Sequence, residues 1–364
     1  MYNVTTRVPQ SILLGLLSSV FLWPADAAPD YHSDKAGILF TARRISGSNC
    51  DKAFLVKGSP ILFQCPPTGK ARVFIRGRWT PLVNRTGFPI VDVRGVDDRG
   101  EIVGNVLAPE GDEPMAGQPS KPFVISSGGM RLLHDLLKVE ASVRAVNRSG
   151  YVIANRYDTY VGALTGEFPS DDTAYVVSRG SNSTAVQIGK GDALAVNDLG
   201  QVLLETPVVR KSLITSLYVW QDAKRTPMPL SHDWSITAIS SFNNEADIAG
   251  TYQTGLPDIN YPFDNYGAFF IHHGVFHKIH EMCEPTGMNN AGDVVGNWLV
   301  TGHAGDEDTH AFVYRHGKLM DLNDVSQVPP KTVLRDALAI DDEGQIIAKG
   351  NRGVYLLSPV RRRG

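Results

Sequence analysis

The chain has 364 residues, of which 42% are hydrophobic and 20% are charged, a composition that is ordinary for a globular protein with a sizeable buried core. Its formal net charge at pH 7 is −3 and its pI is about 6.4. A strongly basic surface is therefore excluded, and we expect no nucleic-acid partner.

The N-terminal residues predict a secretory signal peptide. Arg7 is a positive residue ahead of an uncharged apolar stretch, residues 11–23, and Pro24-Ala25-Asp26-Ala27 has the small-x-small pattern of a cleavage site. The stretch is short for a membrane span, which needs about 17–25 residues. We expect residues 1–27 to be removed, leaving residues 28–364 secreted or periplasmic and without a transmembrane segment. An uncleaved anchor is the alternative.

The next segment, residues 28–90, reads as a degenerate first unit of a β domain. Ala53–Val56 and residues 73–82 have strand character. Cys50 and Cys65 could form a disulfide in an oxidising compartment, or they could be two buried thiols. Cys283 would be a small core residue.

A short phrase then recurs from residue 91 to residue 357: Asn or Asp, two residues, Gly, and a small apolar strand. Its six copies begin at Asp97, Asn147, Asn197, Asn243, Asn289 and Asp341, with spacings of 50, 50, 46, 46 and 52 residues. Such a period indicates repeated β units that share one core. The Asn or Asp side chain can accept from the backbone two residues on, and the Gly can adopt positive φ. Ala246 replaces the Gly in the fourth copy.

A second phrase follows each turn, a run of four residues with an aromatic in second place. Its copies begin at Pro122, Ala174, Leu217, Ala268, Ala311 and Val354. Apolar runs bounded by turn signals predict strands that are buried on both faces. About four strands then fit into each unit of 46–52 residues, which is the content of a propeller blade. A β-sandwich or two unrelated β domains would not require such even spacing.

The ends of the repeat region indicate how the ring closes. The last unit lacks a closing strand, and the N-terminal segment contains strands without the turn phrase. We therefore predict an all-β fold, a single β-propeller over residues 28–364 whose N- and C-terminal strands close the ring. The length of the mature chain corresponds to about seven units of this size, so seven blades is the first choice and six the second.

Histidines cluster in one part of the chain, since seven of the ten lie between residues 272 and 316. His272-His273-Gly274 reads as an exposed hairpin tip. His277 and His280 are three apart, so on a regular strand they would lie on opposite faces and could not easily share an ion.

The loop from residue 303 to residue 310 is the candidate metal site. His303, Asp306, Asp308 and His310 combine imidazole and carboxylate groups, which suit a divalent cation. A solvated acidic loop is the alternative. No cofactor is otherwise indicated.

Acidic residues also lie in equivalent loops of several repeats, where closure of the ring would gather them on one rim. They are Glu110, Asp112, Glu113, Asp158, Glu167, Asp171, Asp172, Asp258, Asp264, Asp306, Glu307 and Asp308. Such a rim would suit cations, basic partners or polar glycans. Solubility alone is the other interpretation.

The fifth repeat contains His310-Ala311-Phe312 after Gly287-Met288-Asn289-Asn290-Ala291-Gly292. This combination resembles the bacterial extracellular repeat family named HAF for its His-Ala-Phe tripeptide. The resemblance covers residues 91–357 and is partial in the other repeats. It implies secretion and a repeated β architecture, with no established activity.

No motif of a known catalytic class is present: the sequence has no Gly-x-Ser-x-Gly, no His-Glu-x-x-His and no Walker loop. We therefore expect an exported, non-catalytic, monomeric binding or scaffold module that recognises an extracellular glycan, protein or cation. The competing hypothesis is a metal-assisted hydrolase or lyase with its site at the central channel.

Overall fold

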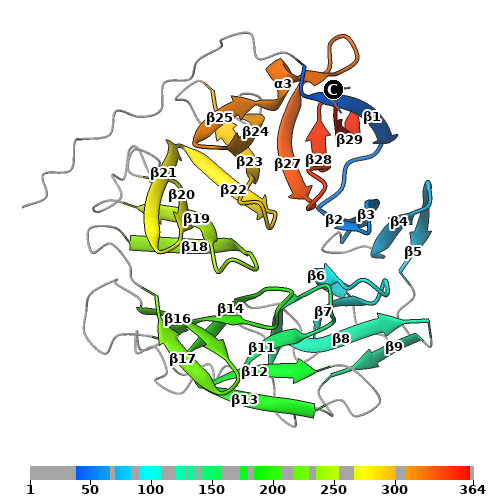
Figure 1. The fold of residues 1–364 in the computed structure, drawn as a ribbon. Coiled ribbons are helices and arrows are strands. Elements are labelled where there is room, and N and C mark those ends of the chain that lie inside the picture. The colour runs from blue at the N-terminus through cyan, green and yellow to red at the C-terminus, as the bar shows by residue number, and fades with distance from the viewer. Residues whose placement is uncertain are drawn as a thin grey trace, which may run out of the picture.

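Each of the six Asn/Asp turns joins the first two strands of one antiparallel sheet, and seven such sheets stand around a central axis (Figure 1). The protein is therefore a seven-bladed β-propeller. The structure is a computed structural model that describes residues 38–65, 70–82, 90–107, 120–127, 129–133, 137, 141–156, 173–178, 184–206, 216–228, 235–253, 266–300 and 309–360.

We number the blades in chain order, and each is built from consecutive strands. Blade 1 contains β2 (Lys52–Val56), β3 (Ser59–Gln64), β4 (Arg72–Ile75) and β5 (Arg78–Pro81). Blade 2 contains β6 (Ile90–Val96), β7 (Ile102–Leu107), β8 (Ser120–Ser126) and β9 (Gly129–Leu132). Blade 3 contains β10 (Ser142–Val146), β11 (Val152–Arg156), β12 (Thr173–Ser178) and β13 (Thr184–Lys190). Blade 4 contains β14 (Asp192–Val196), β15 (Val202–Thr206), β16 (Ser216–Gln221) and β17 (Lys224–Pro227). Blade 5 contains β18 (Ser235–Phe242), β19 (Ile248–Gln253), β20 (Tyr266–His272) and β21 (Val275–Glu281). Blade 6 contains β22 (Cys283–Met288), β23 (Val294–Leu299), β24 (Thr309–Arg315) and β25 (Lys318–Asp321). Blade 7 contains β27 (Leu334–Ile340), β28 (Ile346–Gly350), β29 (Gly353–Pro359), and the added strands β1 (Phe40–Ser46) and β26 (Ser326–Gln327); the short helix α3 (Leu322–Val325) precedes β26.

The core consists of seven hydrophobic clusters, one between each pair of neighbouring blades. The third strands supply both sides of these clusters, as predicted. In β20, Phe269 packs toward blade 4 with Leu203, whereas Phe270 packs toward blade 6 with Phe312. Because each third strand is covered on two faces, its sequence is apolar without alternation.

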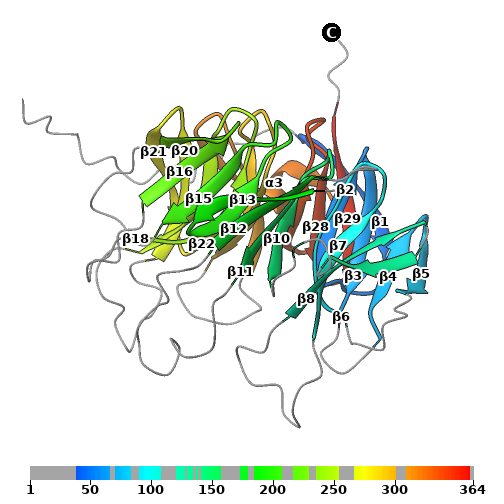
Figure 2. The same ribbon diagram turned by 90° about the horizontal axis from the view of Figure 1, so that it is seen from below.

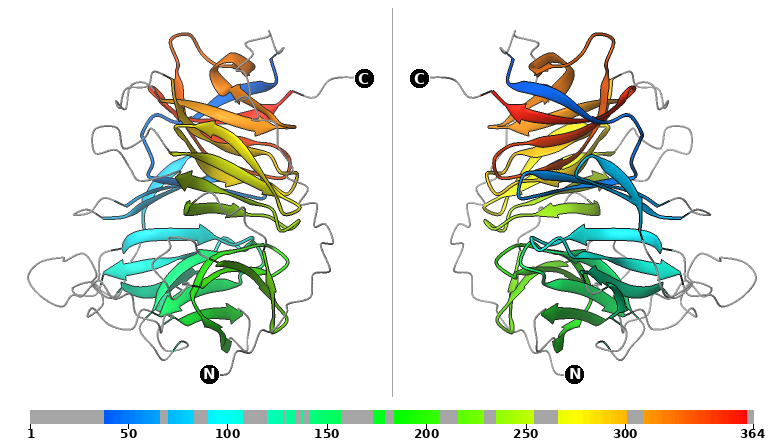
Figure 3. Two further views of the ribbon diagram at one scale, coloured as in Figure 1. Left: turned by 90° about the vertical axis from the view of Figure 1, so that its left-hand side faces the viewer. Right: turned by 90° about the vertical axis from the view of Figure 1, so that its right-hand side faces the viewer.

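Ring closure by the two ends of the chain is confirmed. β1 pairs antiparallel with β29, with Phe40 opposite Pro359, and Figure 3 shows the blue strand beside the red one. The closing strand is residues 40–46, however, and not the segment between residues 53 and 82. That segment forms blade 1, a complete sheet whose first hairpin turns at Lys57 and Gly58.

The small residues that end each repeated strand phrase allow close backbone approach, as predicted. A Cβ added at Gly104 would overlap the carbonyl oxygen of Asp92, and one at Gly296 would overlap that of Glu284. Both glycines also lie under the phenyl ring of the adjacent third strand.

Of the two alternatives for Cys50 and Cys65, the structure shows separate thiols. Cys50 is buried in the cluster between blades 7 and 1, whereas Cys65 packs against the cluster between blades 1 and 2. The two side chains lie toward opposite faces of blade 1, and that arrangement keeps the sulfurs apart. Cys283 is buried in the core, as expected.

Within the described ranges, the structure contains no helix with the length and apolar character that a membrane crossing requires.

Candidate functional site

The propeller has two distinct faces, set by which strand connections reach them. The repeated turns and the hairpins between third and fourth strands lie on one face, here named the turn face, along the upper edge in Figure 2. The second strands run from the turn face to the opposite face. All twelve acidic loop residues of the prediction fall between second and third strands, and they lie outside the described residues.

Hydrogen bonds between the repeated turns link blades 3 to 7 in sequence. Within each turn the first residue accepts from its own backbone, as when Asn243 Oδ1 accepts from the N–H groups of Glu245 and Asp247. The amide of the same residue reaches the next blade. Asn147, Asn197, Asn243 and Asn289 donate to the carbonyls of Asn197, Asn243, Asn289 and Asp341, at 2.7, 2.9, 3.3 and 3.2 Å. We call this series the asparagine ladder.

The second residues of the turns ring the axis. Arg148, Asp198, Asn244 and Asn290 each donate a backbone N–H to the side chain of the next residue in the ring, at 2.9–3.0 Å. Arg148 also reaches across the axis, from blade 3 to blade 7, and its Nη1 lies 2.5 Å from Oδ2 of Asp342. Burial alone would raise the pKa of Asp342, but the N–H of Asn290 and the guanidinium of Arg148 outweigh it and lower that pKa. This ion pair therefore joins two blades that are not neighbours in the ring.

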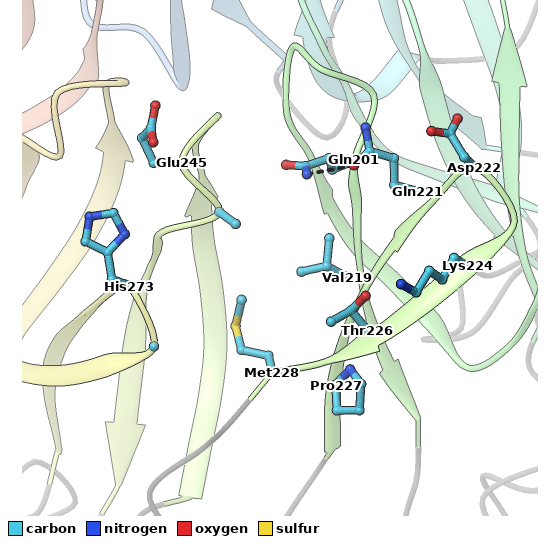
Figure 4. A pocket seen from close by; sticks show the side chains of 12 residues that line it. Gln201, Val219, Gln221, Asp222, Lys224, Thr226, Pro227, Met228, Glu245 and His273 are labelled. Carbon is cyan, nitrogen blue, oxygen red and sulfur yellow. Dashed lines mark hydrogen bonds between the residues drawn. The ribbon is translucent and has the colours of Figure 1, made fainter.

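A groove of about 650 Å³ lies on the turn face between blades 4 and 5 (Figure 4). Val219, Met228 and Ala246 give it an apolar floor. Polar and charged side chains line the remainder: Gln201, Gln221, Asp222, Lys224, Thr226, Glu245 and His273. Gln201 and Gln221 are joined by a hydrogen bond of 3.0 Å from Nε2 to Oε1. The volume is within the usual range of ligand sites.

Beside the groove, Asp247 lies under the tip of the β20–β21 hairpin. Its Oδ2 is 3.0 Å from Nδ1 of His272, and its Oδ1 accepts from the backbone N–H of His273 at 3.2 Å. The hairpin tip predicted at His272-His273-Gly274 is confirmed, with φ of 48° at His273 and 79° at Gly274.

Of the four predicted metal-ligating residues, the structure describes His310 alone. His303, Asp306 and Asp308 lie outside the described residues. His310 lies in β24, where its Nδ1 is 2.5 Å from Oδ2 of Asp321. The cation prediction for this loop stays a prediction.

The prediction that His277 and His280 lie on opposite faces is wrong. A β-bulge opposite Ala268 inserts one residue between them, so His277 pairs with Phe270 and His280 with Ala268. Both imidazoles therefore lie toward blade 6, where the His280 ring centroid is 5.6 Å from that of Trp298. The bulge changes the phase of the strand by one residue.

The three thiols have the character of inert core groups. Burial raises the pKa of Cys50 to about 12 and that of Cys65 to about 11, and it also raises the pKa of Cys283. A cysteine nucleophile requires the opposite, a lowered pKa. None of the three thiols therefore has the lowered pKa of a cysteine nucleophile.

No family model matches the chain, and no curated protein matches it. Similar solved structures include the β-propeller domain of the Trilobed protease from Pyrococcus furiosus, 10% identical over 89% of this chain and 98% of that one, with a TM-score of 0.49. An acylaminoacyl peptidase from Pyrococcus horikoshii is 9% identical over 92% of this chain, which spans 54% of that enzyme, with a TM-score of 0.47. YCF48 bound to D1 peptide is 14% identical over 92% of this chain and 99% of that one, with a TM-score of 0.46. These similarities concern the fold alone.

Sequence reasoning did not identify the groove or the group around Asp247. The groove is formed by two blades that the repeat pattern treats as equivalent. The signal for Asp247 was available in the repeats themselves, because the fourth copy of the turn alone combines an Asp after the turn with a His-His hairpin tip.

Proposed function

We propose that the protein is an exported, non-catalytic binding module that takes an extended segment of an extracellular protein into the groove between blades 4 and 5. The groove is the observation that carries this proposal, since it combines an apolar floor with hydrogen-bonding and charged groups in one concave surface.

The lining favours a peptide over a glycan. Val219 and Met228 offer contact for apolar side chains, and Lys224 and Glu245 provide charges of both signs for a polypeptide's own side chains and backbone. A sugar ring would be better served by an aromatic side chain under its C–H face, and the groove lining contains no Trp, Tyr or Phe.

The two walls of the groove are held in a fixed relation by the turns. Asn197 Nδ2 donates to the carbonyl of Asn243, and the N–H of Asp198 donates to Oδ1 of Asn244. Because these bonds join blade 4 to blade 5, little ordering should be required when a peptide binds, which reduces the entropic cost of association.

Export is part of the proposal and is supported by the signal-like residues 1–27 and by the resemblance to the HAF repeats. Expression of the full chain in a bacterium, followed by fractionation and N-terminal sequencing, tests it. We expect a periplasmic or extracellular product that begins at Ala28. A product retained in the cytoplasm with an intact N-terminus would contradict export.

The peptide hypothesis is tested by panning a random peptide display library on residues 28–364 and measuring the selected peptides by fluorescence anisotropy. Lys224→Glu should weaken binding by about tenfold or more, because it reverses a charge on the groove wall. Lys318→Glu is the matched control, since Lys318 is the first residue of β25 as Lys224 is of β17. It should leave affinity within about twofold.

A glycan array run in parallel distinguishes the ligand classes. Binding of glycans without any selected peptide would overturn the peptide hypothesis. Equal loss of affinity in Lys224→Glu and Lys318→Glu would show that the groove is not the binding site.

A further inference from the structure

We propose that Asp247, His272 and His273 form a binding site for one divalent transition-metal ion, with zinc as the reference ion. One ligand atom from each residue can be chosen so that all three lie within 4.8 Å of one another. The three residues come from the turn between β18 and β19 and from the end of β20.

The carboxylate is held in place by its own turn. Asp247 is 1% exposed, and its Oδ2 accepts from Nδ2 of Asn243 at 3.2 Å while its Oδ1 accepts from the backbone of His273. The two imidazoles are exposed, with ring centroids 3.9 Å apart. The result is a fixed buried oxygen ligand beside two nitrogen ligands that solvent can reach.

The neighbouring blade shows what such a buried carboxylate requires. In blade 6, Asp293 occupies the position of Asp247, and Nη2 of Arg315 lies 2.6 Å from its Oδ2. In blade 4 the same two positions hold the neutral pair Gln201 and Gln221.

Blade 5 therefore differs from both neighbours. It has the buried carboxylate of blade 6, but His272 stands where Arg315 supplies a permanent cation. A buried carboxylate is normally paired with a charge or bound to a metal. In blade 5 the neighbours are two imidazoles, and a metal ion bound by them would supply a positive charge beside Asp247.

The ligand set fits a transition metal. Imidazole nitrogen together with carboxylate oxygen suits zinc, copper and nickel. Zinc bonds both at about 2.0–2.2 Å, so two ligands of one ion lie roughly 3 Å apart. The 3.0 Å separation of His272 Nδ1 and Asp247 Oδ2 meets that requirement, and a bound ion would take the place of this hydrogen bond.

Three protein ligands leave one position of a tetrahedral ion for water or for an incoming donor atom. His273 also lines the groove (Figure 4), so a bound ion would stand at the edge of that surface. The metal proposal does not depend on the peptide proposal, because its ligands and its test are separate.

The test uses residues 28–364, treated with EDTA, dialysed, and titrated with zinc chloride by calorimetry; cobalt is used as a spectroscopic probe. His272→Arg copies the pair of blade 6, so it should fold with an unchanged melting temperature and bind one zinc fewer than the wild type. His316→Gln changes the matching hairpin tip of blade 6 and should leave the stoichiometry unchanged. Arg315→His should add one equivalent, since it recreates the blade 5 set around Asp293.

The test compares the number of zinc ions bound by His272→Arg with the number bound by the wild type. Zinc bound elsewhere is the same in both proteins and does not affect this difference. An unchanged stoichiometry in His272→Arg, or no zinc binding by the wild type, would overturn the proposal. Cobalt absorption in the visible region that disappears only in His272→Arg would assign the site directly. No gain in Arg315→His would contradict the ligand set.

Discussion

Arg148 and Asp342 form an ion pair across the axis of the propeller, 2.5 Å from Nη1 to Oδ2, although they belong to blades 3 and 7. Arg148 also lies 3.5 Å from Asp198 in the neighbouring blade. One guanidinium therefore pairs with two carboxylates, which belong to blades 4 and 7.

We expect this pair to contribute modestly to stability. The side chains are 41% and 32% exposed, so solvent screens the interaction, and a coupling of about 0.2–1 kcal/mol is expected. A double-mutant cycle with Arg148→Ala and Asp342→Asn, measured by urea unfolding, should give that value at low salt and less at high salt. A coupling that is unchanged by salt would show that the contact acts through packing and not through charge.

The dependence of the free energy of unfolding on acidic pH should also show the Arg148–Asp342 ion pair. The folded-state pKa of Asp342 is below its ordinary value of 3.8, so its contribution is complete above about pH 5 and is lost as the pH falls through the folded pKa. Arg148→Ala should therefore lose less stability than the wild type between about pH 5 and about pH 3. The check is urea unfolding at several pH values; parallel curves for the two proteins would contradict the assignment.

The asparagine ladder predicts that exchanging Asn and Asp at the first turn position has different effects at Asn197 and at Asp341. Asn197→Asp removes the amide that donates to Asn243 and places a carboxylate against that carbonyl, so it should destabilise by about 1–3 kcal/mol. Asp341 is the last residue of the ladder, because the first hairpin of the next blade, blade 1, is a two-residue turn at Lys57 and Gly58. Burial raises the pKa of Asp341, so at pH 7 its replacement by Asn should be neutral or stabilising. Thermal unfolding of both variants is the measurement, and equal losses would refute the ladder as a directional series.

Ala246 adopts φ of 62°, the left-handed conformation that the turn phrase predicts for this position. Ala246→Gly should therefore be neutral or stabilising by about 0.4–1 kcal/mol. Gly100→Ala is the matched control: φ is 79° and an added Cβ would contact nothing within 4 Å, so only backbone strain changes. It should destabilise by about 1–2 kcal/mol. Urea denaturation of the two variants gives the comparison, and a destabilised Ala246→Gly would show that another contact of the methyl group dominates.

The three thiols should stay reduced in the folded protein, including in an oxidising compartment. Cys50 and Cys65 face different clusters, and burial raises the pKa of both, so neither is poised as a thiolate. The intact mass under non-reducing conditions should correspond to three free thiols, and dithiothreitol should leave the melting temperature unchanged. A mass lower by two hydrogens would reveal a disulfide and contradict this prediction.

Much of the fold was predictable because its signals are local. The turn at Asn289 and the strand at Ala311 each need only a few neighbouring residues to specify them, and the period then fixes one blade per repeat. Ring closure was predicted from the last unit, which lacks a closing strand, although the N-terminal segment assigned as its counterpart is the complete blade 1. The closing strand itself, Phe40–Ser46, was missed because it has no motif and acquires its role only by pairing with β29.

The site was less predictable for the same reason. The groove depends on how two blades stand side by side, and the contact between Arg148 and Asp342 joins residues 194 positions apart. The bulge that brings His277 and His280 to one face is a change of register, which side-chain alternation alone does not reveal.

The pairing of β1 with β29 has a consequence for how the protein is made. β1 (Phe40–Ser46) stays without its partner until β29 (Gly353–Pro359) has been synthesised and, if the chain is exported, translocated. Contacts between such distant parts of a sequence form slowly. Closure of the ring is therefore a late event. Loss of Gly353–Pro359 would leave the sequences of the other six blades intact but would remove the strand with which β1 pairs.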